Sequence, residues 1–104
     1  MKIYISGPIT GTADFKERFE AAAQKITANG HEAVNPVKLH DILDPATTTW
    51  AQFMSAATGL LYACDAALFL PGWQLSKGAM KERHAARNGG LLIFDDPEDL
   101  PRSI

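Results

Sequence analysis

The chain has 104 residues, of which 46% are hydrophobic and 21% charged, with a formal net charge of −2. This length allows one compact domain, and the composition excludes an intrinsically disordered chain. Because no run of lysine or arginine forms a basic stripe, we expect no binding to DNA or RNA.

The cellular setting follows from the cysteine count and the hydrophobic pattern. A single cysteine, Cys64, cannot form an internal disulfide, and Met1 leads directly into a strand-like run rather than a signal peptide. No apolar stretch approaches the ~20 residues that span a bilayer. We therefore expect a cytoplasmic protein without a membrane anchor.

The first half of the chain alternates between strand and helix patterns. Residues 2–6 are rich in β-branched and aromatic side chains and stop at Gly7 and Pro8, which predicts a strand that leads into a loop. Residues 14–29 carry apolar side chains at helical spacing and predict a helix. Residues 32–35 form a short extended run closed by a proline, which indicates a second strand.

The second half repeats the alternation after an irregular segment at residues 37–49. An apolar stripe at helical spacing over residues 50–64 is the clearest helix in the sequence. Residues 66–70 are continuously apolar, as in a parallel strand buried on both faces. A helix over residues 77–88 and a last strand over residues 91–94 complete the pattern.

This alternation predicts an α/β fold with helices on both faces of a parallel sheet and right-handed crossovers. We expect a flavodoxin-like or Rossmann-like three-layer sandwich with four parallel strands in the order 2-1-3-4. Residues 1–94 should form this single domain. Residues 95–104 should form an acidic tail on the surface or against another subunit.

Ligands of open parallel sheets bind beyond the carboxyl ends of the strands, where the strand order reverses. Here the loops after the first and third strands should meet at that point. The candidate binding residues of the first loop are Ser6, Gly7, Pro8, Ile9 and Gly11. Their glycine spacing is similar to a phosphate cradle but lacks the ending of a P-loop, and a tight strand-to-helix turn is the alternative.

The loop after the third strand offers Trp73, Ser76, Lys77 and Gly78 as binding residues. Ser76 stands at the N-cap of the next helix, where its hydroxyl and the free backbone N–H groups can hold an anion, although capping alone explains it equally well. Trp73 can stack on a base or simply anchor the loop. Asn35, at the tip of the second strand, is a further candidate near the base.

Glu82 is the central carboxylate of the predicted site. Its helix face otherwise carries glycine and alanine, the small residues needed for close packing on a sheet, and no intrahelical salt bridge explains the charge. Glu82 therefore suits a nucleophile or general base, with a solvated glutamate as the alternative. Tyr4 shares a strand face with Ser6 and can bring its hydroxyl near Glu82, with a core tyrosine as the alternative.

The remaining candidates for chemistry are weaker. His31, His40 and His84 have no metal-ligand spacing among themselves or with Cys64, so we expect no metal and no cofactor. Cys64 ends an apolar stripe and should be a core residue. Asp65 precedes the third strand and should have a structural role at the opposite edge of the sheet.

Three segments together resemble the nucleoside 2'-deoxyribosyltransferase-like superfamily, and more closely its short, often phage-encoded branch known as the DUF4406 type. The resemblance runs from Met1 to about Phe94. The segments are Ile3-Tyr4-Ile5-Ser6-Gly7-Pro8-Ile9-Thr10-Gly11, Gly30-His31-Glu32-Ala33-Val34-Asn35-Pro36, and Cys64-Asp65-Ala66 through Leu70-Pro71-Gly72-Trp73 to Ser76-Lys77-Gly78-Ala79-x-x-Glu82.

The resemblance implies a nucleoside 2'-deoxyribosyltransferase or a deoxynucleoside 5'-monophosphate N-glycosidase. In the family, a glutamate matched by Glu82 attacks the anomeric carbon and releases the base, and a tyrosine matched by Tyr4 orients it. A second base or water then takes up the sugar. At Ser76 the transferases carry an aspartate for the 5'-hydroxyl, whereas related hydrolases carry a serine for a 5'-phosphate. Deoxynucleoside 5'-monophosphates are therefore the expected substrates.

One position departs from the family pattern. The aspartate that usually handles the proton of the departing base, eight residues before Asp65, is Ala57 here. General acid catalysis is worth ~10²–10⁴-fold in rate. A non-catalytic nucleotide-binding or sequestering protein and a small protein-interaction module are therefore alternative functions. The resemblance also implies a homo-oligomer in which a neighbouring subunit completes the pocket.

Overall fold

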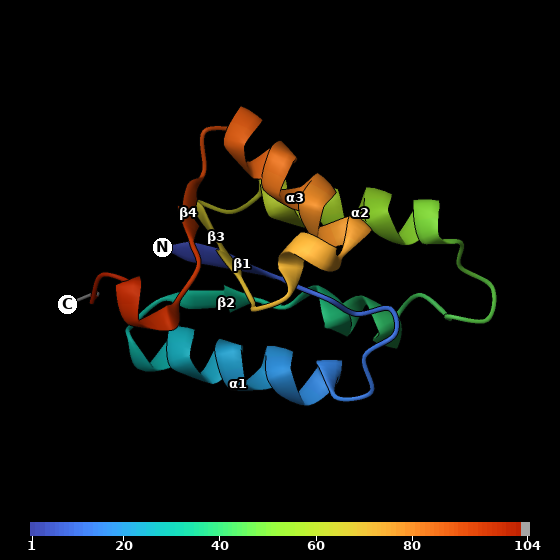
Figure 1. Ribbon diagram of the computed structural model, residues 1–104, viewed down its shortest axis with the longest axis horizontal. Coiled ribbons are helices and arrows are strands. Elements are labelled where there is room, and N and C mark those ends of the chain that lie inside the picture. The colour runs from blue at the N-terminus through green and yellow to red at the C-terminus, as the bar shows by residue number, and fades with distance from the viewer. Residues whose placement is uncertain (103–104) are drawn as a thin grey trace.

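The computed structural model describes residues 1–102 and has three layers, with a parallel sheet between two helical layers (Figure 1). The sheet has four strands in the order β2-β1-β3-β4, all pairs parallel, which confirms the predicted topology. The strands are β1 (Lys2–Ser6), β2 (Glu32–Val34), β3 (Ala66–Phe69) and β4 (Leu92–Phe94). The α-helices are α1 (Phe15–Ala28), α2 (Trp50–Tyr62) and α3 (Lys77–Asn88), and the 3-10 helices are η1 (Pro36–Asp41), η2 (Trp73–Leu75) and η3 (Pro97–Asp99).

Helix α1 covers one face of the sheet, and α2 and α3 cover the other (Figure 1). Side chains of a strand point alternately to its two faces. Ile3 and Ile5 of β1 therefore pack in the core beneath α1, whereas Tyr4 packs beneath α2 and α3. Ser6 shares the face of Tyr4, so both hydroxyls point toward α3.

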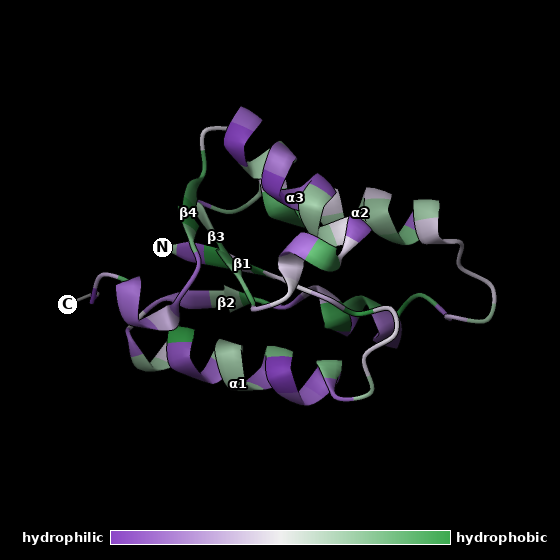
Figure 2. Cartoon of the chain, in the orientation of Figure 1, coloured by the Kyte–Doolittle hydropathy of each residue, from purple (hydrophilic) through white to green (hydrophobic). Residues whose placement is uncertain are grey.

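Apolar residues concentrate in the strands, and α1 and α3 carry many hydrophilic residues, whereas α2 is largely apolar (Figure 2). Strand β3 is buried along its whole length, as expected for the central position beside β1. Cys64 is buried just before this strand. No helix within residues 1–102 is long and apolar enough to cross a membrane.

Two side chains at the amino edge of the sheet hold the ends of the chain. The Asp65 carboxylate accepts a hydrogen bond from the backbone N–H of Lys2 at 2.8 Å. His31 contacts the N-terminal amine through Nδ1 at 3.0 Å and the carbonyl of Pro101 through Nε2. Met1 and Pro101 therefore lie at the end of the sheet opposite the strand tips.

The C-terminal tail folds back on its own chain. Most of its residues are exposed, but Leu100 is buried in the core beneath α1, beside η3. Its apolar side chain gives the acidic segment one anchor that charge composition alone does not indicate. Residues 103 and 104 lie outside the described residues.

Candidate active site

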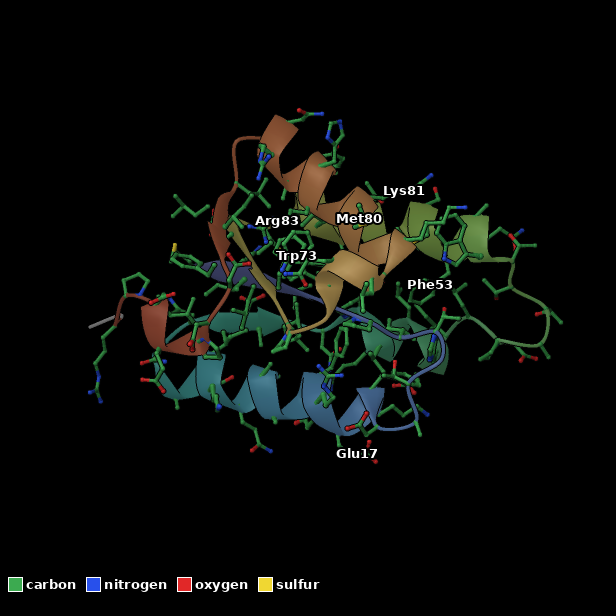
Figure 3. All side chains as sticks on the ribbon, in the orientation of Figure 1. Glu17, Phe53, Trp73, Met80, Lys81 and Arg83 are labelled. Carbon is green, nitrogen blue, oxygen red and sulfur yellow. The ribbon has the colours of Figure 1, made fainter. Side chains whose placement is uncertain are left out.

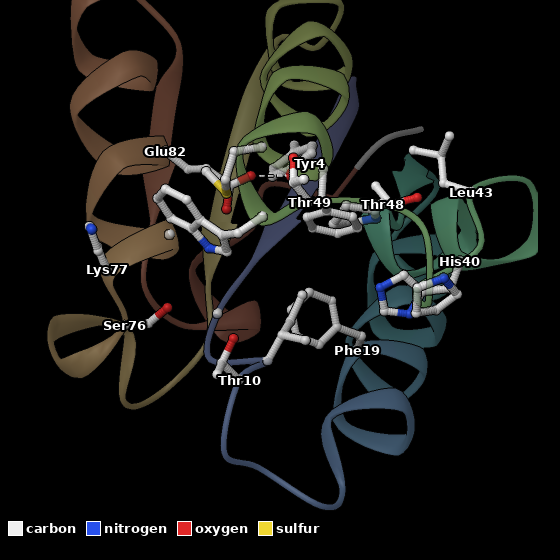
Figure 4. A pocket seen from close by; sticks show the side chains of 18 of the residues that line it. Tyr4, Thr10, Phe19, His40, Leu43, Thr48, Thr49, Ser76, Lys77 and Glu82 are labelled. Carbon is white, nitrogen blue, oxygen red and sulfur yellow. Dashed lines mark hydrogen bonds between the residues drawn. The ribbon is translucent and has the colours of Figure 1, made fainter.

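A cavity of about 580 Å³ opens at the carboxyl ends of the strands (Figure 4). This volume lies in the ~300–1,000 Å³ range of small-molecule sites. Its walls come from β1 and the following loop, from η1 and the segment after it, and from the N-terminal turns of α2 and α3. The cavity thus occupies the place where ligands bind in open parallel sheets.

Glu82 of α3 is the one carboxylate on the cavity wall within residues 1–102. Its side chain is 6% exposed and accepts two hydrogen bonds. The Tyr4 hydroxyl donates to Oε2 (Figure 4), and the Ser6 hydroxyl donates to Oε1 at 2.8 Å. Two side chains of β1 therefore hold the carboxylate at the edge of the cavity.

The Glu82 carboxylate is buried without a nearby cation, and this environment shifts its pKa. Burial raises the pKa of Glu82, and the hydrogen bonds from Tyr4 and Ser6 partly oppose that rise. Burial and the nearby carboxylate also raise the pKa of Tyr4 well above its ordinary value, so its hydroxyl stays protonated and donates. The salt bridge found in residues 1–102 joins Arg83 to Asp95 and leaves Glu82 without a cationic partner. Glu82 is thus a desolvated carboxylate oriented by two neutral donors.

One part of the loop after β1 lines the cavity, and the other part forms a turn. Gly7, Ile9 and Thr10 line the cavity, and Thr10 lies within the predicted binding loop although it was not one of its candidate residues. A Cβ on Gly7 would lie 2.9 Å from the Cβ of Leu70, so the loop packs tightly on the end of β3. Gly11 has a φ of +80° and open space around it, as a turn requires, and does not line the cavity.

Pro8 also lies off the cavity wall. It packs against Gly72, where a Cβ would be 3.2 Å from the Pro8 Cγ. Gly72 has a φ of +91°. Pro8 and Gly72 therefore join the loops after β1 and β3 rather than contact the cavity.

At the start of α3, Ser76, Lys77 and Gly78 all line the cavity. The Ser76 hydroxyl accepts a hydrogen bond from the backbone N–H of Ala79 at 3.2 Å, so the serine is both the N-cap and part of the wall. A Cβ on Gly78 would lie 3.2 Å from the sulfur of Met54, which shows how closely α2 approaches α3 here. The first turn of α3 contains no acidic residue.

Trp73 and Asn35 lie outside the cavity wall. The Trp73 ring packs edge-on against Phe69 at 6.0 Å, with the Arg83 guanidinium 4.1 Å from its centre (Figure 3). Through these contacts Trp73 anchors the loop after β3. The Asn35 side chain accepts a hydrogen bond from the Val37 backbone N–H at 3.0 Å and caps η1. Asn35 thereby positions η1, which contributes to the cavity wall.

Much of the remaining cavity wall consists of residues that sequence reasoning had not assigned to the site. They are mainly aromatic and hydroxyl side chains from α1, the segment after β2 and the start of α2: Phe19, His40, Leu43, Thr48, Thr49, Trp50, Phe53 and Met54. The capping box of Thr49 and Gln52 sets the start of α2 and so places its first turn over the cavity. A useful signal was available, because a long irregular segment inside a compact domain is often functional.

The three histidines occupy different surroundings. His40 lines the cavity, His31 binds the chain ends and His84 is exposed on α3. No group of three or more histidine, cysteine, aspartate or glutamate side chains able to hold a metal ion occurs in the part of the chain that the structure describes.

Comparisons with known proteins agree on one family and one fold. A family model described as "Domain of unknown function (DUF4406)" matches residues 1–95. A comparison with curated proteins finds no match. A 2-deoxyribosyltransferase from the psychrotolerant bacterium Bacillus psychrosaccharolyticus superimposes with a TM-score of 0.72 at 14% identity, over 100% of this chain and 93% of that one.

A 2-desoxiribosyltransferase from Leishmania mexicana superimposes with a TM-score of 0.66 at 18% identity, over 88% of this chain. The alignment covers 61% of the Leishmania chain, so the present chain spans about three fifths of that protein. At these identities the likeness shows a shared fold.

Proposed function

Because the chain belongs to the DUF4406 family and shares its fold with two 2-deoxyribosyltransferases, we propose that it is a nucleoside 2'-deoxyribosyltransferase-like protein that cleaves the N-glycosidic bond of 2'-deoxynucleosides or transfers their deoxyribosyl group. Its preferred substrates are the 5'-monophosphates. The observation that carries this proposal is the buried Glu82 carboxylate, held by Tyr4 and Ser6 on the wall of a cavity of about 580 Å³.

In the proposed reaction, Glu82 attacks C1' of the deoxyribose and the base departs. Each carboxylate oxygen accepts one hydroxyl hydrogen bond, which orients the group and leaves a further lone pair for attack. Burial disfavours the charged carboxylate, and forming a neutral ester removes that charge from a poorly solvated place. Water or a second base then attacks C1' and regenerates Glu82.

The 5'-phosphate is proposed to bind at the N-terminus of α3. Ser76 supplies a hydroxyl, Lys77 a positive charge, and the free backbone N–H groups of the first turn favour an anion. Thr10 faces the same part of the cavity from the loop after β1 (Figure 4). An aspartate in place of Ser76 would repel the phosphate, whereas the neutral serine hydroxyl can donate a hydrogen bond to it.

The base is proposed to occupy the opposite, largely apolar end of the cavity. Phe19 and Leu43 are labelled on that side in Figure 4, and Phe53, whose ring contacts His40, contributes from α2. Aromatic and aliphatic walls with a few polar groups are typical of sites for planar ligands.

The test is release of free base, followed by chromatography, from a panel of deoxynucleosides and their 5'-monophosphates. We expect the wild type to release base and Glu82→Gln, which keeps the side-chain shape, to release none. Glu20→Gln, on the exposed side of α1, is the matched control and should behave as the wild type. No release by the wild type from any substrate at high enzyme concentration would contradict the proposal.

The preference for a 5'-phosphate is tested with a substitution at Ser76. Ser76→Asp keeps an effective N-cap but adds a negative charge at the proposed phosphate position. It should lower kcat/KM for the monophosphate far more than for the unphosphorylated nucleoside. An equal effect on both substrates would contradict phosphate binding at this position.

A second candidate function is that of a nucleotide-binding or sequestering protein without turnover. Ala57 favours it, because this fully buried side chain of α2 offers no proton where the family usually places an aspartate. Calorimetry with the same nucleotides distinguishes the two functions. Saturable binding without base release would establish the second.

We also propose that the chain forms a homo-oligomer, as the resemblance implies. Leu75 stands at the cavity wall with 94% of its surface exposed, and Ile42 next to the opposite wall is 79% exposed. A second copy over this side would remove both from water. Light scattering after size exclusion should give a multiple of the chain mass, and a monomer at micromolar concentration would contradict the proposal.

A further inference from the structure

His40 is the titratable side chain on the cavity wall to which the proposed reaction has assigned no role. It belongs to η1, and Figure 4 shows it across the cavity from Glu82, Ser76 and Lys77. The chain that precedes it is well held, because Asn35 caps η1 and Val37 and Leu39 are buried.

The His40 ring is positioned by aromatic contacts and retains free nitrogen atoms. It lies edge-on to Phe15 at 6.0 Å and tilted against Phe53 at 5.2 Å. Among residues 1–102, the histidine ring that forms hydrogen bonds to protein groups is that of His31. Since no buried side-chain nitrogen or oxygen in this part of the chain lacks a partner, the His40 nitrogens reach accessible space.

Breaking an N-glycosidic bond places the bonding electron pair on the base, so a proton donor to the base lowers the barrier. The titratable groups on the described cavity wall are Tyr4, His40, Lys77 and Glu82. Glu82 is the proposed nucleophile, the proton of Tyr4 is held in its bond to that carboxylate, and Lys77 lies at the proposed phosphate end. Imidazole exchanges protons readily near neutral pH and is the usual general acid of enzymes.

We propose that His40 is the general acid that protonates the departing base and the general base that activates the incoming water, an inference that rests on the proposed function. It takes the role for which the family usually has an aspartate at the position of Ala57. Ala57 lies one helical turn from Phe53, which contacts the His40 ring and lines the cavity.

The proton balance closes over the two half-reactions. As a Glu82 oxygen bonds to C1', the C1'–N bond breaks, its electron pair stays on the base, and the imidazolium N–H proton of His40 moves to a base nitrogen. Water then attacks C1' and gives a proton to the neutral imidazole, while the carboxylate leaves with the ester electron pair. The products are the free base and deoxyribose 5-phosphate, and both Glu82 and His40 return to their starting states.

The arrangement orders the parts of one substrate across the cavity. A phosphate at Ser76 and a sugar at Glu82 direct the base toward the wall that carries His40 (Figure 4). A donor on that wall contacts the base rather than the sugar. His40 is therefore a catalytic residue in this proposal and not a positioning residue for Glu82.

The test compares leaving groups that do and do not require a proton. One substrate is the best natural nucleotide from the panel, and the other is N7-methyl-2'-deoxyguanosine 5'-monophosphate, whose cationic base departs as a neutral molecule. His40→Gln should lose on the order of 10²–10⁴-fold in kcat/KM on the natural nucleotide and less than about 10-fold on the methylated one. His84→Gln, on exposed α3, is the matched control and should lose neither activity.

Equal losses on both substrates would overturn the proposal, because His40 would then act in binding or folding. Unchanged activity on the natural nucleotide would overturn it as well. Nucleotide affinity and thermal unfolding of His40→Gln are measured alongside, so that a misfolded variant is recognised and replaced by His40→Asn. Failure of the proposed function is a different result, in which the wild type itself releases base from neither substrate.

Discussion

Replacing Tyr4 with phenylalanine removes the hydroxyl that donates to Glu82 and keeps the buried ring. A hydrogen bond to a charged group contributes ~1.5–3 kcal/mol to stability, and one to a neutral group ~0.5–1.5 kcal/mol. Tyr4→Phe should therefore cost about 1.5–3 kcal/mol at a pH where Glu82 is ionised, and about 1 kcal/mol less where it is protonated.

The pH dependence of this loss has a definite sign. The folded-state pKa of Glu82 lies above its ordinary value, and the Tyr4 hydrogen bond opposes that rise, so Tyr4→Phe raises the folded-state pKa further. A carboxyl with a raised folded-state pKa favours folding below its unfolded pKa, and this contribution is lost as the pH rises through the folded pKa. Tyr4→Phe should accordingly lose more stability than the wild type between about pH 4 and pH 8.

Urea denaturation at the two pH values measures both effects. Tyr62→Phe is the matched control, because this tyrosine is 55% exposed and its hydroxyl should matter by less than about 0.5 kcal/mol. A Tyr4→Phe variant as stable as the wild type would refute the hydrogen bond. A loss that is the same at both pH values would refute the ionised state of Glu82.

Three further predictions concern packing. Gly7→Ala brings a Cβ to 2.9 Å from that of Leu70 and should lower the free energy of unfolding by ~1–3 kcal/mol. Gly59→Ala, in open space on α2, should raise it by up to ~1 kcal/mol. Changes of the same sign for both variants in urea denaturation would contradict the tight packing at Gly7. Burial raises the pKa of Cys64 to about 11, so a disulfide reagent should label the native protein on the order of 100-fold more slowly than the unfolded protein, and equal rates would be inconsistent with a buried thiol. Leu100→Ala should cost about 2 kcal/mol in thermal or urea unfolding, and a change below about 0.5 kcal/mol would show that the tail does not dock.

The fold could be predicted from the sequence because each element has a strong local pattern. The continuous apolar run at β3 marks a strand buried on both faces, and the glycine pairs and prolines mark where strands and helices stop. Glu82 could be selected for the same reason, as a lone charge among small residues on the face of α3 that packs on the sheet. Alternation along β1 then gave Tyr4 and Ser6 the matching direction.

The far wall of the cavity could not be predicted in this way. Residues 36–49 contain a 3-10 helix and turns, which lack the periodicity that identifies α-helices and strands. The position of His40 on the cavity wall could therefore not be predicted. The aromatic residues at the start of α2 fit the apolar stripe of an ordinary core helix, although Trp50 and Phe53 line the cavity. Periodicity indicates which face is apolar, and cannot distinguish a core from a cavity wall.

The direction of single loop side chains was also beyond the sequence. Trp73 follows Gly72, whose positive φ turns the chain so that the ring meets Phe69 instead of the cavity. Asn35 uses its side chain to cap η1. Both stand at strand tips as expected, but the local turn and not the strand decides where each side chain lies.

The central claim is that Glu82 forms a covalent bond to the sugar, and intact-protein mass spectrometry tests it most directly. The protein is incubated with a 2'-fluoro-arabinosyl analogue of its best nucleotide, in which the fluorine slows release of the sugar from the enzyme. We predict a mass increase of one fluorinated sugar phosphate per chain, located by peptide mapping on Glu82 and absent from Glu82→Gln. Base release without any adduct, or an adduct on another residue, would contradict the account.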